Sequence, residues 1–236
     1  MTTTDDFWQL HDESVLLATT TYGPQRARMA VIAIGAIGEG DLLIVSPGTG
    51  MSDAAWARVA AWGAPRFLLA PNHFHNAGLA KWQARFPDAQ IVAHPRAQAR
   101  LRKKLPGHTI TDLADLQAAL PPDVRVFSPP GAKQGETFVS VQRPTGPAWF
   151  VTDALVNESK LPGGPTGLII RLFGFRTGLM TNPFFKRFFL ADRPAYKQWL
   201  LAELGRDRPT LFIPSHGDPL HGPDLVDRLR ATADAL

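Results

Sequence analysis

The chain has 236 residues, of which 44% are hydrophobic and 19% are charged, and this composition is typical of a globular protein with a buried core. It contains no cysteine, which excludes disulfide bonds, a thiolate nucleophile and cysteine-based zinc sites, so any metal ion must be held by histidines and carboxylates. The net charge of +4 is modest and most basic residues are spread along the chain, so we expect no nucleic-acid partner.

The sequence indicates a soluble, cytoplasmic protein. No apolar run approaches the roughly 18–20 residues needed to cross a bilayer, so no membrane span is predicted. The first residues, MTTTDDFWQLHDES, are acidic where a signal peptide would be basic and then apolar. The basic run at 96–104 is interpreted as the solvated surface of a helix, rather than a phosphate or nucleic-acid patch, because its charges wrap around more than one helix face.

The first half of the chain alternates strands and helices. Apolar runs at 28–34 and 42–46, joined by a glycine-rich link, predict a β-hairpin. Ser52 is expected to cap the helix that follows, which ends near residue 61. The elements expected after it are a strand at 67–70, a helix at 79–86, a strand at 90–93, a helix up to residue 104 and a short helix at 112–120.

The second half of the chain is also predicted to contain strands and helices. Strands are expected at 124–127, 137–142 and 148–152, followed near the carboxyl terminus by a helix at 195–204, a strand at 210–213 and a helix at about 223–235. Strands and helices mixed in this order favour sheets flanked by helices, which is an α/β fold with mixed sheets. We find no internal repeat and no flexible linker, so a single domain over residues 1–236 is predicted.

Residues 157–193 differ in character from the rest of the predicted domain. They are rich in glycine, proline and phenylalanine, with arginines and lysines among them. We interpret this segment as a helical, aromatic-rich insert. The simplest arrangement is a helix pair packed on the domain with its basic residues in solvent. A substrate lid, a homodimer interface and a membrane-surface helix are the alternatives.

Histidines and carboxylates follow several of the predicted strands. His73 and His75 come one residue apart after the strand at 67–70, flanked by Asn72 and Asn76. Alternate residues of an extended segment point the same way, and imidazole is the commonest protein ligand of metals, so this turn is a candidate metal site. Two further strands are followed by Asp153 and by His216, with Asp218 beside it; ligands usually bind where strand ends meet loops.

The order of these motifs resembles that of the metallo-β-lactamase superfamily. The family's motif His-x-His-x-Asp-His corresponds here to residues 73–78, its Pro-Gly-His loop to residues 130–137, its bridging aspartate to Asp153, and its last histidine to His216 in Pro-Ser-His-Gly-Asp-Pro. The resemblance covers roughly residues 15–230. It implies a four-layer αβ/βα sandwich with a metal site at the edge between two sheets.

Several of the family's metal ligands have no counterpart in this chain. The aspartate and third histidine of the first motif fall on Ala77 and Gly78, and the histidine of the second motif has become Ala132. The closer likeness is to a degenerate, little-described branch of the superfamily that lacks several ligands. A catalytic zinc needs about three protein ligands and an open position, so the remaining residues are sufficient for one ion.

The resemblance implies a metallo-β-lactamase-like hydrolase with an incomplete site. At most one ion, of zinc, iron or manganese, is held by His73, His75, Asp153 and His216, and it activates water against an ester, an acyl compound or a similar small substrate. Asp153 is the catalytic candidate, and the arginines of the insert favour an anionic substrate. Asn72, Asn76 and Asp218 are further site candidates, and Glu136 is near enough in sequence to contribute. The alternative is a metal-free pseudo-enzyme that binds a small molecule or a partner protein.

Overall fold

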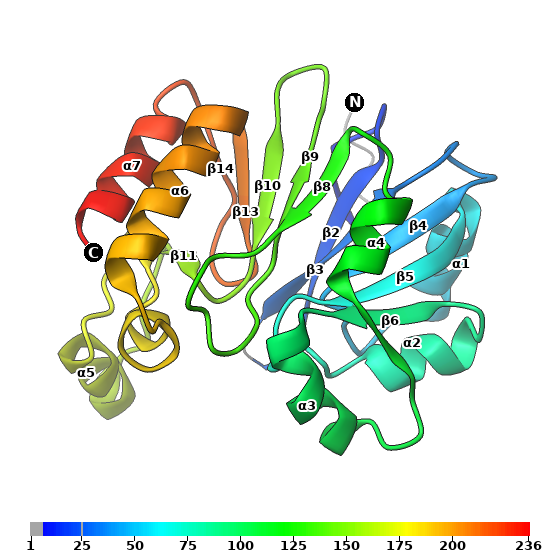
Figure 1. Cartoon of the computed structure of the whole chain (residues 1–236), viewed down its shortest axis with the longest axis horizontal. Coiled ribbons are helices and arrows are strands. Elements are labelled where there is room, and N and C mark those ends of the chain that lie inside the picture. The colour runs from blue at the N-terminus through cyan, green and yellow to red at the C-terminus, as the bar shows by residue number, and fades with distance from the viewer. Residues whose placement is uncertain (1–6, 25) are drawn as a thin grey trace. The chain divides into compact units, whose positions relative to one another are not determined.

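A computed structural model describes residues 7–24 and 26–236, and these residues form two compact units, Met1–Val126 and Phe127–Leu236 (Figure 1). Each unit is described by itself. The acidic residues 1–6, which contribute to the prediction that no signal peptide is present, lie outside the described residues. The prediction of a single domain stays a prediction.

The first unit is built on a seven-stranded sheet whose strands follow the order of the chain. Its members are β1 (Gln9–Asp12), β2 (Leu17–Tyr22), β3 (Ala27–Ala33), β4 (Asp41–Val45), β5 (Ala64–Ala70), β6 (Gln90–Ala93) and β7 (Ile110–Asp112). Strands β1 to β4 pair antiparallel, and the predicted hairpin is confirmed as β3 and β4. Strands β4 to β7 pair in parallel, so their carboxyl ends lie at one edge of the sheet.

Four helices connect the strands of this unit, namely α1 (Asp53–Trp62), α2 (Leu79–Arg85), α3 (Pro95–Lys104) and α4 (Leu113–Ala119). Ser52 caps α1 as predicted, because its hydroxyl accepts a hydrogen bond of 3.1 Å from the amide of Ala55. Trp56 of α1 packs edge-on against Trp82 of α2, with ring centroids 4.6 Å apart. Both indoles belong to the hydrophobic core of this unit, together with residues of the parallel strands.

A second sheet has five strands in the order β14-β13-β10-β9-β8, and four of them, β9, β10, β13 and β14, lie in the second unit. Its strands are β8 (Val124–Phe127), β9 (Phe138–Val141), β10 (Ala148–Val151), β13 (Leu211–Pro214) and β14 (Leu220–His221). Strands β10 and β13 pair in parallel and β9 and β14 flank them antiparallel. Helices α6 (Arg193–Asp207) and α7 (Leu225–Asp234) run side by side, and Trp149, Tyr196 and Phe212 are in the core of this unit (Figure 1).

The segment predicted as a helical insert is helical only in part. It contains helix α5 (Gly164–Leu172) and a π-helical turn, η1 (Phe185–Phe189). Between them lies β12 (Gly178–Thr181), which pairs antiparallel with β11 (Leu155–Glu158) as a separate two-stranded sheet. The proline and glycine content of the segment does not indicate this pairing, because it joins residues some twenty positions apart in a phenylalanine-rich sequence.

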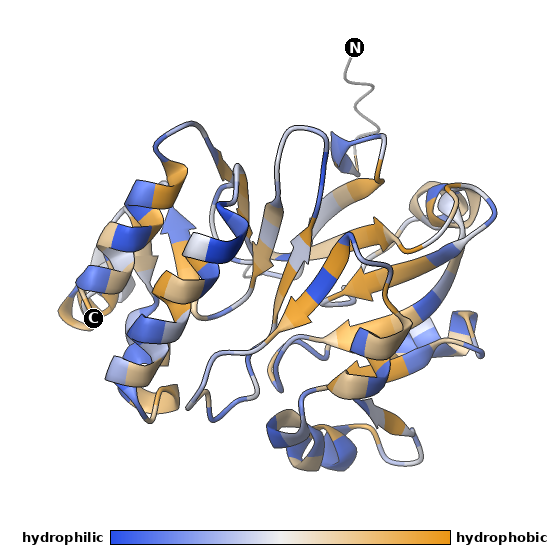
Figure 2. Ribbon diagram, turned by 45° about the horizontal axis from the view of Figure 1, so that its top comes forward, coloured by the Kyte–Doolittle hydropathy of each residue, from blue (hydrophilic) through white to orange (hydrophobic). Residues whose placement is uncertain are grey.

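In both units the strands are more uniformly hydrophobic than the helices (Figure 2). The strands are coloured mainly as hydrophobic, whereas the helices carry hydrophobic and hydrophilic residues on different faces (Figure 2). Mixed sheets with helices confirm the predicted α/β class. Within residues 7–24 and 26–236, no helix has the length and apolar character required to cross a bilayer. The cytoplasmic location stays a prediction.

Candidate metal centre

The loop that carries the two histidines begins at the carboxyl end of β5. Two asparagine side chains shape it, because the Asn72 carboxamide oxygen accepts hydrogen bonds from the amides of Phe74 (2.8 Å) and His75 (3.4 Å). Asn76 donates through Nδ2 to the carbonyls of His73 (2.6 Å) and Phe74 (3.1 Å). Both amides therefore hold the turn in shape. That either one also binds a metal stays a prediction.

His75 is buried and is oriented by two side chains of its own unit. Its Nδ1 lies 2.8 Å from the hydroxyl of Ser46, which in turn lies 2.8 Å from the hydroxyl of Tyr22. Ser46 follows β4 and adopts a left-handed backbone conformation with φ of 57°, which is uncommon for a residue other than glycine and is often found at functional sites. With Nδ1 engaged by Ser46, Nε2 is the atom through which His75 can bind a metal.

His73 has different surroundings although it is equally buried. Its Nε2 lies 3.3 Å from Nη1 of Arg100, and a guanidinium has only donors, so Nε2 of His73 accepts this hydrogen bond. Arg100 also lies over the ring of Phe74, 5.6 Å from its centroid. A fixed positive charge beside Nε2 disfavours a metal cation at that atom. His73 as a metal ligand stays a prediction, and these contacts argue against it.

Gly78 stands where the resembled family has the third histidine of its first motif, and the local packing excludes any side chain there. A Cβ at this position would overlap the carbonyl oxygens of Pro47 and Gly48. The amide of Gly78 donates to the Pro47 carbonyl at 3.0 Å, which fixes the two backbone segments together. Trp82 donates through Nε1 to the carbonyl of Gly48 at 3.0 Å. The loss of this ligand is therefore built into the packing of the first unit.

Ala132 stands where the resembled family has its next histidine. In the second unit it is buried and forms a β-bridge with Leu190, and both residues belong to the hydrophobic core. A histidine side chain at position 132 would have to displace apolar neighbours. The structure thus accounts for two of the ligand losses that the sequence indicates.

Asp153 and His216 are brought together by the register of two parallel strands. Val151 at the end of β10 is aligned with Pro214 at the end of β13, so Asp153 and His216 each lie two residues beyond an aligned pair. The Oδ1 atom of Asp153 lies 3.4 Å from Nε2 of His216. Both side chains are about one-fifth exposed, which leaves them accessible to an ion or a substrate.

The separation of these two atoms fits a shared metal ion. Zinc binds histidine nitrogen and carboxylate oxygen at about 2.0–2.2 Å, so two ligand atoms at the tetrahedral angle lie about 3.4 Å apart. The observed distance of 3.4 Å between Asp153 Oδ1 and His216 Nε2 agrees with this value. The donors are also of the types that zinc, iron and manganese accept, so they do not identify the metal.

Glu136 positions Asp153, and sequence reasoning treated it only as a nearby candidate ligand. It is fully buried, and its Oε1 accepts hydrogen bonds from the Thr152 hydroxyl (2.7 Å) and from the amides of Asp153 (2.8 Å) and Ala154 (3.1 Å). Its Oε2 accepts one from Gln134 Nε2 at 3.3 Å. One carboxylate therefore fixes the loop after β10. The available signal was an acidic residue two positions before the apolar strand β9.

The loop that carries His216 is fixed by Asn157 of β11. The amide of Asn157 donates to the His216 carbonyl (3.3 Å), and its side chain donates to the Asp218 carbonyl (2.7 Å). The carbonyl of Asn157 accepts from the Asp218 amide (2.8 Å). Burial raises the pKa of Glu158, the neighbouring charge of His216 lowers it, and Asp218 raises it, so Asp218 lies near Glu158. Asp218 as a ligand stays a prediction.

In the first unit, His94 follows β6, at the same edge of the sheet as the loop after β5. It caps α3. Its Nδ1 accepts a hydrogen bond of 3.1 Å from the Arg96 amide. Burial lowers the pKa of His94 from the ordinary value of 6.5, the charge of Arg96 lowers it further, and Asp112 opposes the shift. Neutral His94 is therefore the form that the folded protein favours.

We expect the free energy of unfolding to fall as the pH decreases below about 6.5, because unfolded His94 then takes up a proton before folded His94 does. This contribution is fully present above the unfolded pKa and is lost towards the lower folded pKa. Urea denaturation between pH 5 and pH 8 measures it, with His94→Asn as a cap that does not titrate. An unchanged pH profile in His94→Asn would contradict this assignment.

Comparison with known proteins supplies the class of the fold. No protein-family model matches the sequence, and no curated protein matches it either. Solved structures do match over nearly the whole chain. The metallo-β-lactamase DIM-1 has 15% identity and a TM-score of 0.56, covering 97% of this chain and 98% of that chain. The metallo-β-lactamase FIM-1 from Pseudomonas aeruginosa, in its mono-zinc form, has 13% identity and a TM-score of 0.57, covering 97% and 94%.

A flavo di-iron protein variant from Thermotoga maritima also matches, with 9% identity and a TM-score of 0.59, covering 96% of this chain and 61% of that chain. These matches define the class of the fold, which is α/β. The chain has the metallo-β-lactamase fold, as the motifs predicted. At such low identities the match establishes the fold alone.

Proposed function

We propose that this protein is a metal-dependent hydrolase that holds one ion through Asp153 and His216 of the second unit, with His75 as the third ligand that the sequence resemblance implies. The observation that carries the proposal is the Asp153–His216 pair, held at 3.4 Å by aligned strand ends. Two supports come from the environment of the ligands. Ser46 orients His75 and Glu136 fixes the backbone of Asp153, in the way that outer partners of metal ligands usually do. Three protein ligands leave an open position for substrate or water, as catalytic zinc sites require.

In this proposal each residue has a distinct task. His75 and His216 are neutral ligands, which requires their ring nitrogens to be deprotonated at the metal. Asp153 supplies the negative charge of the site and orients the attacking water as a hydrogen-bond acceptor. A bound metal would supply Lewis acidity and lower the pKa of water. In the overall reaction the oxygen of water bonds to the acyl carbon of an ester substrate as the acyl–oxygen bond breaks; the acid keeps one hydrogen of the water and the alcohol leaves with the other.

The proposed ligand set differs from the one that the sequence suggested. His73 is omitted because its Nε2 accepts a hydrogen bond from Arg100, which places a cation beside the atom that would bind a metal. The arginine instead supports the earlier expectation of an anionic substrate, since it adds positive charge to the loop that carries His75. The metal remains one of zinc, iron and manganese, and the substrate is an ester, an acyl compound or a similar small molecule.

Metal analysis of protein purified without chelator tests the proposal. We expect about one ion per chain, and at least about tenfold weaker metal affinity in each of His75→Ala, Asp153→Asn and His216→Ala. The same three variants should lose hydrolysis of a chromogenic ester. His221→Ala is the matched control, because this histidine is exposed on β14 and lies outside the proposed set.

His73→Ala separates the two ligand sets. If the three-residue set is correct, this variant keeps its metal, whereas loss of the metal as in His75→Ala would restore the four-residue set. Protein that contains no metal, and whose thermal unfolding midpoint is unchanged by added zinc, iron or manganese, contradicts the proposal as a whole. A ligand that binds only the native state must raise stability.

A further inference from the structure

Helix α5 and the turn η1 expose an apolar surface that the rest of the fold does not require. Only Gly167 of α5 is buried. The exposed large apolar residues of the segment are Leu168 (59%), Ile169 (55%), Leu172 (80%), Phe173 (46%), Phe184 (38%) and Phe188 (48%). Phe184 joins several of them, with its ring centroid 5.2 Å from that of Phe173 and 6.3 Å from that of Phe188. Contiguous exposed patches of this kind mark interaction sites.

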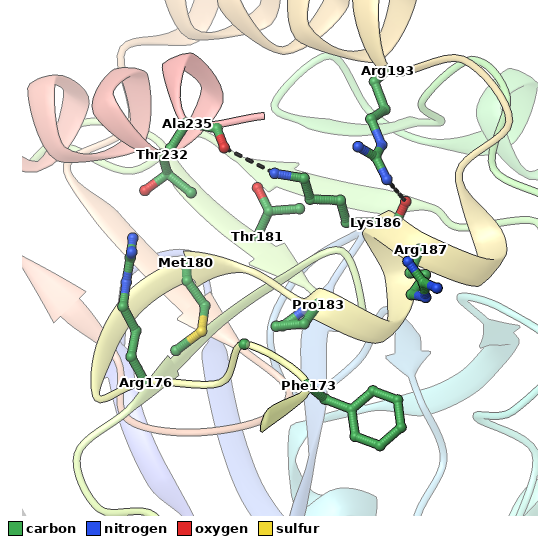
Figure 3. Close-up of a pocket in the computed structure, with 11 residues that line it drawn as sticks. Phe173, Arg176, Met180, Thr181, Pro183, Lys186, Arg187, Arg193, Thr232 and Ala235 are labelled. Atoms are coloured by element: carbon green, nitrogen blue, oxygen red, sulfur yellow. Dashed lines mark hydrogen bonds between the residues drawn. The ribbon is translucent and has the colours of Figure 1, made fainter. Parts of the chain in front are cut away.

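A cavity of about 300 Å³ opens beside this surface (Figure 3). Phe173 and Pro183 form part of its wall, so the cavity and the apolar surface share a border. Four cationic side chains also line it, and they come from the loop before β12, from η1 and from α6: Arg176, Lys186, Arg187 and Arg193. The described lining residues include no acidic side chain.

Among the residues that the structure describes, none of these four cationic side chains forms an ion pair with a carboxylate. Lys186 donates to the carbonyl of Ala235 at 2.9 Å, and Arg193 donates to the carbonyl of Lys186 at 3.3 Å, so both bind neutral backbone oxygens (Figure 3). Asp192 caps α6 through the amide of Ala195, and Asp234 pairs with Lys197 at 2.9 Å. Burial lowers the pKa of Lys186, and the charges of Arg193 and Arg176 lower it further, as expected for clustered cations.

We propose that α5 and η1 dock this protein on a membrane surface that contains anionic phospholipids. In this arrangement a lipid phosphate enters the cationic cavity, and exposed side chains such as Leu172 and Phe173 enter the boundary between head groups and acyl chains. Stable attachment to a bilayer generally needs two signals, apolar insertion and attraction to anionic lipid, and this segment presents both side by side.

Charge favours an anionic membrane, rather than a second copy of the chain, as the partner of this surface. A twofold homodimer through the same surface would bring the cationic cavities of both protomers to one interface. Like charges brought together in this way repel each other, whereas a lipid phosphate neutralises them. The predicted homodimer through the insert therefore becomes the competing outcome of the test.

Flotation of the full-length protein with vesicles tests the proposal. We expect binding to an equal mixture of phosphatidylcholine and phosphatidylglycerol, little binding to phosphatidylcholine alone, and weaker binding at high salt. Arg176→Gln combined with Lys186→Gln should weaken binding by about fivefold for each charge removed. Leu172→Asp should abolish it while leaving the fold intact, because this side chain is 80% exposed.

Lys103→Gln combined with Lys104→Gln is the matched control, because it removes the same charge from exposed positions of α3. Equal loss of binding in this control overturns the proposal, since net charge alone would then explain the attraction. Binding of inorganic phosphate without vesicle binding also overturns it and indicates a site for a small soluble anion. The proposal is also overturned if the protein binds no vesicles and instead forms a dimer that Leu172→Asp dissociates. The metal content of the purified protein tests the proposed hydrolase function independently of vesicle binding.

Discussion

Replacing Gly217 with alanine is expected to lower the free energy of unfolding by about 3 kcal/mol, because two penalties combine at this residue. Its φ of 92° lies in the region that disfavours side chains. A Cβ would also overlap the carbonyl oxygen of Asn157 and lie 3.0 Å from the amide nitrogen of Glu158. Both obstacles are backbone atoms of β11, so a change of side-chain rotamer cannot relieve the clash. Urea denaturation measures the loss.

Gly205→Ala is the matched control for this substitution. Gly205 lies inside α6, and an added Cβ would meet nothing within 4 Å. Alanine there should stabilise the protein by up to about 1 kcal/mol, since it has the higher helix propensity. Gly217→Ala should also weaken metal binding, because it displaces the neighbouring His216. Equal stabilities of the two variants would show that the loop adjusts without cost.

Replacing Glu136 with alanine is expected to lower the free energy of unfolding by about 3–5 kcal/mol, because it breaks a buried charged network. Two backbone amides and the Thr152 hydroxyl would lose their acceptor together. The loop after β10 would then loosen, and Asp153 would no longer be held at its distance from His216. We expect metal affinity to fall by about tenfold or more, as when an outer partner of a metal ligand is removed.

Glu136→Gln tests whether shape or charge matters at this position. Its amide oxygen can still accept from Thr152, Asp153 and Ala154, and its amide group can donate to Gln134 Oε1, which has no hydrogen-bond partner among the described residues. We therefore expect a smaller loss of stability than in the alanine variant. Calorimetric unfolding and metal titration of both variants provide the comparison. A glutamine variant as unstable as the alanine variant would mean that the negative charge itself is required.

The charge of Glu136 also affects the buried side chain of Tyr196. This tyrosine is fully buried, and burial followed by the nearby Glu136 carboxylate raises its pKa well above the usual value. The phenol therefore stays neutral beside the carboxylate. The donors to Glu136 described above are amides and a hydroxyl, all of them neutral.

Local sequence patterns predicted the strands well because burial on both faces demands continuous apolar runs. Strand β6 is confirmed with the predicted bounds, and Asp153 and His216 follow β10 and β13 as expected. The different surroundings of His73 and His75 were not predictable from alternation. Residues beyond β5 form a turn rather than an extended strand, so the rule that alternate side chains point the same way does not apply.

The role of Glu136 and the partner of His73 depend on contacts between distant positions. Arg100 lies 27 residues from His73, and the hydrogen bonds of Glu136 with residues 152–154 span 16 to 18 residues. Spacing within a motif carries no information about such pairs. The β11–β12 pair was missed for the same reason, since its strands are separated by α5.

The tight packing of Gly78 against Pro47 and Gly48 limits which residues position 78 can accept. A single substitution cannot return the missing histidine to position 78, because the variant would clash with main-chain atoms before it could offer a ligand. Restoring it would first require rebuilding the turn at residues 47 and 48, which also anchors Trp82. A variant designed to add a metal ligand would therefore have to use a position other than 78 or change the turn first.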